Sequence, residues 1–363
     1  MRRRALKVRL PQTLKGSIGI HYQNRVHTSP WLIPVKEVFL MKYKVQFLFC
    51  LLSVSVLCWK VCAVFAKAPD TAKIVFAKAS IGETRDIYLM NPDGSEKVNL
   101  TNHRADDIYP VWSPTGEHIL FASNREQKAW GTWDLYLMEP DGSNVQKVFD
   151  KWKRRTGPTW SPDGKRIAYS YGEIGNTLLY IGTIDGKDEE RVAIGYTPAW
   201  SPDGTEIIFR SGALDKPRRF SLLKVRTKRQ TFFPFPKEPM WVRGPAWSPN
   251  GDKLAFSWHI DGFREEAIYI VNRDGTDPQE IVGDLTTRAA DPTWSPDGTQ
   301  LLYTQLVNRE LHIFKVALDG GKPVQLTHEG WNYVGGWFDP EFALPVLPQP
   351  QLLTTLWGEL KRK

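Results

Sequence analysis

Short apolar runs separated by turn-forming residues make up most of the chain after residue 66. Some runs are apolar nearly throughout, such as RIAYS at 166 and EIIFRS at 206, whereas others alternate, such as DIYLM at 86 and DLYLM at 134. These are patterns of β-strands, because an amphipathic helix would repeat its apolar residues every three or four positions over a longer stretch. We therefore predict an all-β fold for residues 67–340.

One phrase returns along the chain at a nearly constant spacing. It reads PTWSPDG at 158, PAWSPDG at 198, PAWSPNG at 245 and PTWSPDG at 292. The tryptophans that align are Trp112, Trp160, Trp200, Trp247, Trp294 and, in the worn form GGWFDP, Trp337, with spacings of 48, 40, 47, 47 and 43 residues. Such a period, with four short strands in each unit, is typical of a β-propeller blade.

The Ser-Pro-Asp-Gly part of the phrase predicts a tight turn after the first strand of each unit. Pro presets the backbone angle, Asp bonds nearby amides and Gly takes the left-handed position. The residues expected in this role are Asp163, Gly164, Asp203, Gly204, Asp297 and Gly298. The repeated tryptophans should pack between neighbouring blades.

The two ends of the repeat complete each other. The segments KIVFAKA at 73 and DIYLMNPDG at 86 read as second and third strands with no first strand before them, whereas Trp337 lies in a first strand with none after it. We predict six four-stranded antiparallel blades, with the strand near Trp337 joining the N-terminal strands. This closure would remove exposed sheet edges.

The phrase P-x-W-S-P-D-G-x-x-I-x-[FY], followed by [IL]-Y-x-M-x-x-D-G and L-T, resembles the repeat of TolB-like propellers over about residues 70–340. The resemblance implies a six-bladed propeller. It also implies a periplasmic protein, because the propeller of TolB binds a peptidoglycan-associated lipoprotein there. TolB carries a separate domain before its propeller. In this chain only about six residues separate the expected cleavage site from the first strand, so we expect that domain to be missing.

Residues 41–66 have the features of a secretory signal peptide. Lys42 and Lys44 precede an apolar run that is short for a membrane span, and Val64-Phe65-Ala66 suits cleavage. We interpret residues 1–40 as a mis-assigned start, with a cytoplasmic extension as the alternative. Bulky Leu57 before Cys58 disfavours a lipid anchor. The expected location is periplasmic or secreted.

The net positive charge of the chain and all of its cysteines lie in this leader and the segment before it. Residues 1–66 hold 11 of the 48 Lys and Arg but one of the 40 Asp and Glu, which leaves 37 against 39 and a net charge of −2 for the remainder. We therefore expect no nucleic-acid partner. All three cysteines, Cys50, Cys58 and Cys62, lie before residue 67, so no disulfide or thiolate site is expected beyond it.

Motifs for catalysis are sparse. No G-x-S-x-G nucleophile elbow occurs, and the histidines show no H-E-x-x-H or paired spacing. The Asp of each Ser-Pro-Asp-Gly lacks the further acids of a calcium loop and is interpreted as a turn former. We expect no catalytic residue, no metal and no cofactor, and interpret the chain as a binding protein.

The loops that lead into the first strand of each unit should meet at one end of the central channel. They carry aromatic, arginine and acidic residues, which suit a peptide or a glycan because rings offer stacking area and Arg offers forked hydrogen bonds. Ordinary solvated loops are the alternative. The candidate partner-binding residues are Asp106, Asp107, Tyr109, Arg154, Arg155, Tyr196, Trp241, Arg243, Arg288, Asp291, Trp331 and Tyr333.

Two segments depart from the repeat. Residues 216–241 lack the Asp-Gly turn and read KPRRFSLLKVRTKRQTFFPFPKEPMW, which indicates either a degenerate blade with a solvated edge, the interpretation we favour, or a surface for an acidic partner or a polyanionic glycan. Residues 341–363 are Pro-rich and end in a short apolar and then basic tail.

Together these features predict an exported, monomeric, non-enzymatic propeller. We expect it to bind a protein or peptide partner of the cell envelope, such as a lipoprotein. A carbohydrate-binding or polysaccharide-lyase-like propeller that uses the same channel is the alternative.

Overall fold

The structure is a computed structural model that describes residues 67–80, 82–126, 132–151, 153–172, 177–212, 219–235, 241–259, 266–283 and 288–344. The expected signal peptide at 41–66, the segment before it and most of the expected tail at 341–363 lie outside the described residues. Among the described residues, no helix has the length and apolar character needed to cross a membrane.

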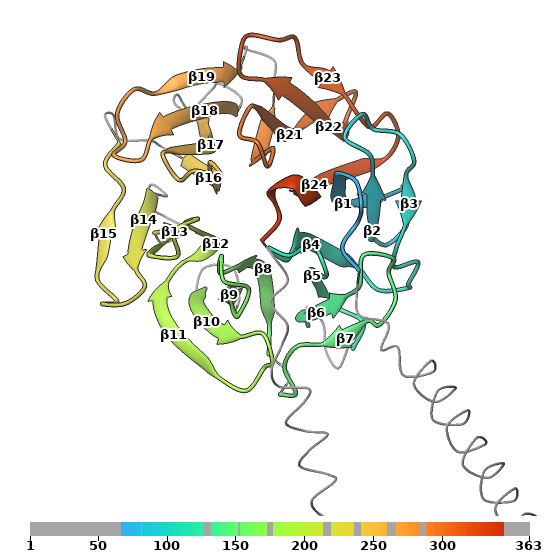
Figure 1. Cartoon of the computed structure of the whole chain (residues 1–363), viewed down its shortest axis with the longest axis horizontal. Coiled ribbons are helices and arrows are strands. Elements are labelled where there is room, and N and C mark those ends of the chain that lie inside the picture. The colour runs from blue at the N-terminus through green and yellow to red at the C-terminus, as the bar shows by residue number, and fades with distance from the viewer. Residues whose placement is uncertain are drawn as a thin grey trace, which may run out of the picture. The chain divides into compact units, whose positions relative to one another are not determined.

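The strands form six four-stranded antiparallel sheets arranged in a ring (Figure 1). Blade 1 comprises β4 (Asp107–Trp112), β5 (Ile119–Ser123), β6 (Asp134–Met138) and β7 (Gln146–Lys147). Blade 2 comprises β8 (Arg155–Trp160), β9 (Arg166–Tyr171), β10 (Leu178–Thr183) and β11 (Glu189–Ile194). Blade 3 comprises β12 (Tyr196–Trp200), β13 (Glu206–Ser211), β14 (Arg219–Lys224) and β15 (Gln230–Phe232).

Blade 4 comprises β16 (Trp241–Trp247), β17 (Lys253–His259), β18 (Ala267–Asn272) and β19 (Gln279–Val282). Blade 5 comprises β20 (Ala289–Trp294), β21 (Gln300–Val307), β22 (Glu310–Ala317) and β23 (Val324–Gln325). Blade 6 comprises β24 (Trp331–Phe338), β1 (Lys73–Ala79), β2 (Asp86–Met90) and β3 (Val98–Asn99), and a 3₁₀ turn follows at Pro340–Phe342.

Blade 6 confirms the predicted closure of the ring. Its strand order is β24-β1-β2-β3, so the innermost strand comes from the C-terminal end of the propeller and the other three from the N-terminal end. Trp337 lies opposite Ile74 in the antiparallel register. The six-bladed all-β fold predicted from the repeat is therefore correct.

The core is divided into six clusters, each between two neighbouring blades. Trp200, for example, packs with Ile207 of its own blade and with Ala168 and Leu179 of blade 2. The other repeated tryptophans, Trp112, Trp160, Trp247, Trp294 and Trp337, lie in or against the corresponding clusters. The repeat is therefore a packing requirement, since each blade buries its faces only against its neighbours.

The Ser-Pro-Asp-Gly segments form the expected turns. Gly164, Gly204 and Gly298 have left-handed φ angles of 68°, 71° and 74°. In the first of these turns Asp163 Oδ1 accepts hydrogen bonds from Ser161 Oγ at 2.5 Å and from the backbone N–H of Lys165 at 3.1 Å. Asp203 and Asp297 accept the corresponding bonds in their own turns.

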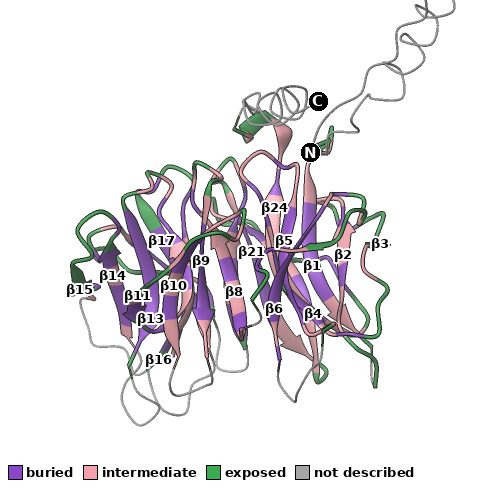
Figure 2. Cartoon of the chain, turned by 90° about the horizontal axis from the view of Figure 1, so that it is seen from below, coloured by how far each residue is buried: buried purple, intermediate pink, exposed green. Residues whose placement is uncertain are grey.

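The antiparallel order of the blades gives the ring two different faces. The innermost strands β4, β8, β12, β16, β20 and β24 surround the centre (Figure 1) and all begin at one end, which we call the mouth. They end on the opposite face, where β8, β12 and β20 lead into the Ser-Pro-Asp-Gly turns, β4 and β16 lead into Ser-Pro-Thr-Gly and Ser-Pro-Asn-Gly, and β24 leads into Asp339-Pro340. Seen edge-on, buried residues occupy the middle of the strands and exposed residues gather in the turns (Figure 2).

Candidate functional site

Every innermost strand contains an irregularity near its middle. The pairing register with the second strand shifts between Ile108 and Val111 in β4, and at the corresponding place in the other five blades. Five residues at these bulges have left-handed φ angles, namely Tyr109 (54°), Gly157 (56°), Thr197 (49°), Gly244 (59°) and Asp291 (55°). Each of the five precedes the proline of the repeated phrase. The bulges therefore form a ring around the channel.

Three of these bulges are strained. A left-handed φ suits Gly, whereas a residue with a Cβ atom pays about 1–2 kcal/mol for it. Tyr109, Thr197 and Asp291 adopt it within strands, while the other non-glycine residues with positive φ lie in turns and loops of the described chain. Backbone strain of this kind clusters at functional sites, which makes these three residues candidates for such a site.

Contacts between blades hold the bulges in place. The backbone N–H of Asp291 donates to Ser257 Oγ of blade 4 at 2.9 Å, and that of Thr197 donates to Ser170 Oγ of blade 2 at 3.0 Å. The strained residues are thus fixed by their neighbouring blades and are presented in one conformation.

Charged groups meet at this level of the channel. Arg243 of β16 donates from Nη2 to Asp291 Oδ2 of β20 at 3.0 Å, and its Nη1 lies 3.4 Å from Glu266 Oε2. Burial lowers the pKa of the Arg243 guanidinium, but the two carboxylates outweigh that effect, so the pKa is raised. Arg243 therefore carries a fixed positive charge between two acids.

Tyr109 completes the arrangement from the other side of the ring. Tyr109 is 54% exposed, yet it lies in the innermost strand β4, which faces the other inner strands. This enclosure, together with the charge of Asp291, raises the pKa of the Tyr109 phenol, against the opposing charges of Arg85 and Arg243. The phenol of Tyr333 in β24 also raises the pKa of Tyr109. We name Tyr109, Arg243, Glu266, Asp291 and Tyr333 the channel cluster.

Two of the candidate residues lie inside the blades. Asp107 is fully buried and accepts from Arg125 Nη2 at 3.0 Å. Arg155 is also fully buried and pairs with Asp134 at 2.8 Å and with Glu189 at 3.0 Å. The Asp107 side chain braces blade 1, and the Arg155 side chain links blade 2 to blade 1 through Asp134, so neither forms part of an exposed surface at the mouth.

The remaining candidates lie near the start of their strands. Trp241 begins β16 and is 37% exposed, Tyr196 begins β12 under the guanidinium of Arg210, and Trp331 begins β24. Arg154 is half-buried and Arg288 is exposed, each directly before a first strand. Asp106 is held by Arg85 at 3.1 Å. The structure brings together Tyr109, Arg243, Asp291 and Tyr333 and spreads the others around the mouth.

Sequence analysis did not identify Glu266 as a member of the channel cluster, nor Arg85 as a charge that lowers the pKa of Tyr109. Each residue directly precedes the third strand of its blade, β18 or β2, and carries no repeat signal. The bulges did leave a signal, because the residue before each proline of the repeated phrase is the one that turns left-handed. Among the described residues, no group of three or more His, Cys, Asp or Glu side chains is placed to hold a metal ion.

Comparisons with known proteins agree with the propeller fold. A family model described as a TolB β-propeller domain matches residues 194–343. TolB from Acinetobacter baumannii superimposes with a TM-score of 0.64 at 17% identity, over 74% of this chain and 67% of that protein. The putative TolB from Agrobacterium tumefaciens gives a TM-score of 0.57 at 19% identity, over 76% of this chain and 99% of that one.

Hydrazine synthase from Kuenenia stuttgartiensis is also similar in structure. Its TM-score is 0.60 at 12% identity, over 78% of this chain and 49% of that protein. No curated protein sequence matched the chain. At these identities the structural likeness shows the fold, and the chemistry of the site has to be argued from the residues of this chain.

Proposed function

We propose, from the premise that the chain is a TolB-like six-bladed β-propeller, that it binds a segment of a protein or peptide partner at the mouth of its channel. The observation that carries the proposal is the channel cluster. Strained backbone holds Tyr109 and Asp291 beside the fixed charge of Arg243. The proposed action is binding without catalysis.

The chemistry of the cluster suits a polypeptide. The Arg243 guanidinium and the phenols of Tyr109 and Tyr333 offer donors to backbone carbonyl groups, and Asp291 and Glu266 offer acceptors to N–H groups. Exposed Trp241 adds apolar contact area at the rim. Because the groups are held before a partner arrives, little conformational entropy is lost on binding.

The proposed setting is the cell envelope. It rests on the leader at 41–66, which is followed by a chain with a net charge of −2 and no cysteine. An envelope protein, such as a lipoprotein, is the proposed partner, and the chain is proposed to act as a monomer. Fractionation of cells that produce the full chain tests this setting, since recovery in the cytoplasm alone would contradict it.

A quantitative pull-down from envelope extract tests binding at the mouth. The bait is the full chain, compared with a Tyr109→Ala/Arg243→Ala variant. A matched control, Phe342→Ala/Arg191→Ala, removes an exposed aromatic residue from the 3₁₀ turn at Pro340–Phe342 and an exposed arginine from the outer strand β11. We expect the channel variant to lose a partner by about tenfold or more, as for a hot-spot pair, while the control retains it. Equal recovery with all three baits would contradict the proposal.

The exposed rings favour a second candidate function. Tyr109 and Trp241 could stack on sugar rings, so a carbohydrate ligand in the same channel is the alternative. A glycan array with the full chain, followed by a test for release of unsaturated sugars with added divalent metal, separates the two. Binding of a glycan that Tyr109→Ala abolishes would favour the alternative.

A further inference from the structure

Blade 3 differs from the other blades at the turn between its third and fourth strands. In four blades a turn glycine lies so close to the preceding blade that an added Cβ would be 2.8 Å or less from a backbone carbonyl oxygen. These pairs are Gly94 with Leu326, Gly142 with Leu100, Gly186 with Val148, and Gly275 with Pro234. The turn of blade 3 contains no glycine and reads Val225-Arg226-Thr227-Lys228.

The altered turn has its own internal support. The backbone N–H of Lys228 donates to the carbonyl of Lys224 at 2.8 Å, and Lys228 has a left-handed φ of 58°. Val225 is buried, and its N–H donates to the carbonyl of Thr205 at 2.9 Å. The turn is thus anchored to blade 3 through its backbone and to the core cluster between blades 2 and 3 through Val225, whereas Arg226, Thr227 and Lys228 are exposed.

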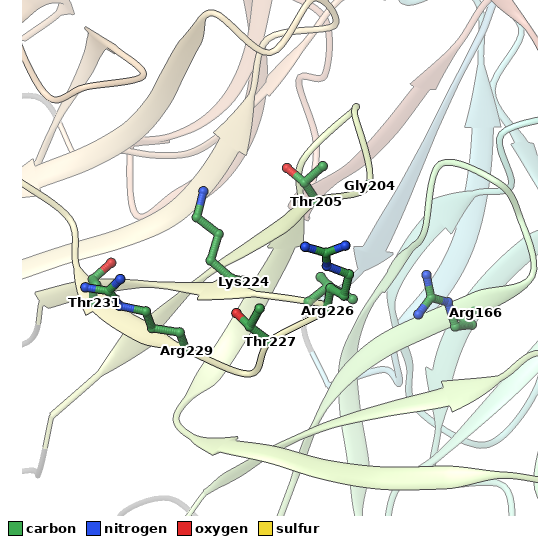
Figure 3. Close-up of a pocket in the computed structure, with 9 residues that line it drawn as sticks. Arg166, Gly204, Thr205, Lys224, Arg226, Thr227, Arg229 and Thr231 are labelled. Atoms are coloured by element: carbon green, nitrogen blue, oxygen red, sulfur yellow. The ribbon is translucent and has the colours of Figure 1, made fainter.

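An open depression of about 1110 Å³ surrounds this turn (Figure 3). Its lining is rich in cations and hydroxyl groups, and no carboxylate is among the described residues that line it. The residues that carry these groups are Arg166, Lys224, Arg226, Arg229, Thr205, Thr227 and Thr231. We call this the basic surface. Arg226 lies between Arg166 of blade 2 and Lys224 (Figure 3).

The cations of the basic surface differ in how far they are neutralised. Lys224 pairs with Glu206, and the neighbouring Lys228 pairs with Glu190 at 2.9 Å. Arg226 and Arg229 are exposed, and their side chains make no hydrogen bond or ion pair with any residue that the structure describes. Two guanidinium groups, with their forked donors, are therefore free for carboxylates.

We propose that the basic surface is a second binding site, separate from the channel, for a short acidic segment of a partner protein. Charge complementarity supports an anionic ligand. The size of the positive region decides which one, because residues 67–363 have a net charge of −2. A long polyanion or a membrane would extend past these cations over a chain that has no overall excess of positive charge, whereas a short segment needs favourable charges only within a Debye length of about 8 Å.

The edge of blade 3 also favours a polypeptide. The outermost strand β15 is exposed along its length, and Thr231 of this strand belongs to the basic surface. A free strand edge offers N–H and C=O groups that an extended peptide can pair with. Acidic side chains on such a peptide would come within reach of Arg229 and Arg226.

Fluorescence anisotropy with a short labelled peptide of glutamate and serine tests the site on the full chain. We expect Arg226→Glu/Arg229→Glu to weaken binding by about tenfold or more, and Arg226→Gln/Arg229→Gln to weaken it less. Lys253→Glu/Lys322→Glu is the matched control, since both lysines are exposed and the change in net charge is the same. It should retain binding, as should Tyr109→Ala/Arg243→Ala.

Three outcomes would overturn the proposal. One is no binding of the peptide by the unchanged protein, and another is an equal loss in the Lys253/Lys322 control, which would indicate a diffuse charge effect. The third is binding of duplex DNA, a sulfated glycan or phosphatidylserine vesicles through Arg226 and Arg229 that is tighter than binding of the peptide. That result would show that the basic surface binds another class of ligand. Unchanged thermal unfolding of each variant shows that a loss of binding is not a loss of fold.

Discussion

Trp337 in β24 lies directly opposite Ile74 in β1, so the last strand of the propeller is the inner strand of the blade that its first strand begins. Gly335 reinforces this closure. A Cβ atom at Gly335 would lie 2.6 Å from the carbonyl oxygens of both Val75 and Pro110. The close approach therefore joins blade 6 to blade 1, and it also joins the first and last strands of the propeller within blade 6.

Gly335→Ala is expected to destabilise the ring. The added methyl group meets backbone atoms from two strands, which cannot move as a flexible side chain could, so we expect a loss of about 2–3 kcal/mol in the free energy of unfolding. Denaturant unfolding of the full chain measures it. Gly321→Ala is the control, because its nearest neighbour is the Cβ of Ala317 at 3.1 Å. Equal stability of both variants would show that closure does not depend on this approach.

Much of the fold could be predicted because the repeat encodes it locally. The turn residues Asp163 and Gly164 and the packing tryptophan Trp160 occupy one short phrase. The tryptophan recurs in six blades, the turn glycine in five and the aspartate in three, and each has the same role where it recurs. The composite blade followed from counting strands at the two ends. Neither inference required knowing which distant residues touch.

The candidate site was harder to predict because it depends on such distant contacts. Arg155 and Arg243 stand near the start of equivalent strands, yet Arg155 is buried by Asp134 and Glu189, whereas Arg243 remains in the channel with Asp291. The partners come from other strands or blades. Sequence spacing alone does not distinguish an arginine that braces a blade from one that faces the channel.

Relief of strain at the bulges should raise stability. Thr197 has a left-handed φ, and its buried hydroxyl group has no hydrogen-bond partner among the described residues. We expect Thr197→Gly to stabilise the protein by about 1 kcal/mol. Gly244→Ala should do the opposite, because its Cβ would lie 2.8 Å from Asp291 Cα. Thermal unfolding measures both, and destabilisation by Thr197→Gly would argue against stored strain.

Ionisation of Glu189 should make the free energy of unfolding depend on pH. Burial alone raises its pKa, but hydrogen bonds from Lys153, Tyr169 and Arg155 outweigh burial and lower the pKa to about 2, from 4.5 in the unfolded chain. The ionised carboxylate therefore stabilises the fold fully above about pH 4.5, and this stabilisation is lost as the pH falls toward 2.

Glu189→Gln should accordingly cost about 2–3 kcal/mol at pH 7 and flatten the decline of stability below pH 4.5. Urea unfolding at pH 7 and pH 3 measures both effects. Glu190→Gln, at the next position, is the control, because its partner Lys228 and Glu190 itself are exposed and such a pair contributes little. If the two variants lose the same stability at pH 7, the buried network is not the source.

The electrostatics of the channel cluster can be followed through Tyr109. Enclosure by the inner strands and the charge of Asp291 raise the pKa of its phenol, and Arg243 opposes them. Asp291→Asn removes a negative charge and should lower that pKa, while Asn tolerates the left-handed backbone. Arg243→Gln removes a positive charge and should raise the pKa of Tyr109 further.

Absorbance titration of each variant, taken as a difference from the same variant carrying Tyr109→Phe, isolates the phenol of Tyr109. Opposite shifts in the two variants would place both charges beside Tyr109, whereas a pKa that neither variant moves would mean that the groups do not act as one site.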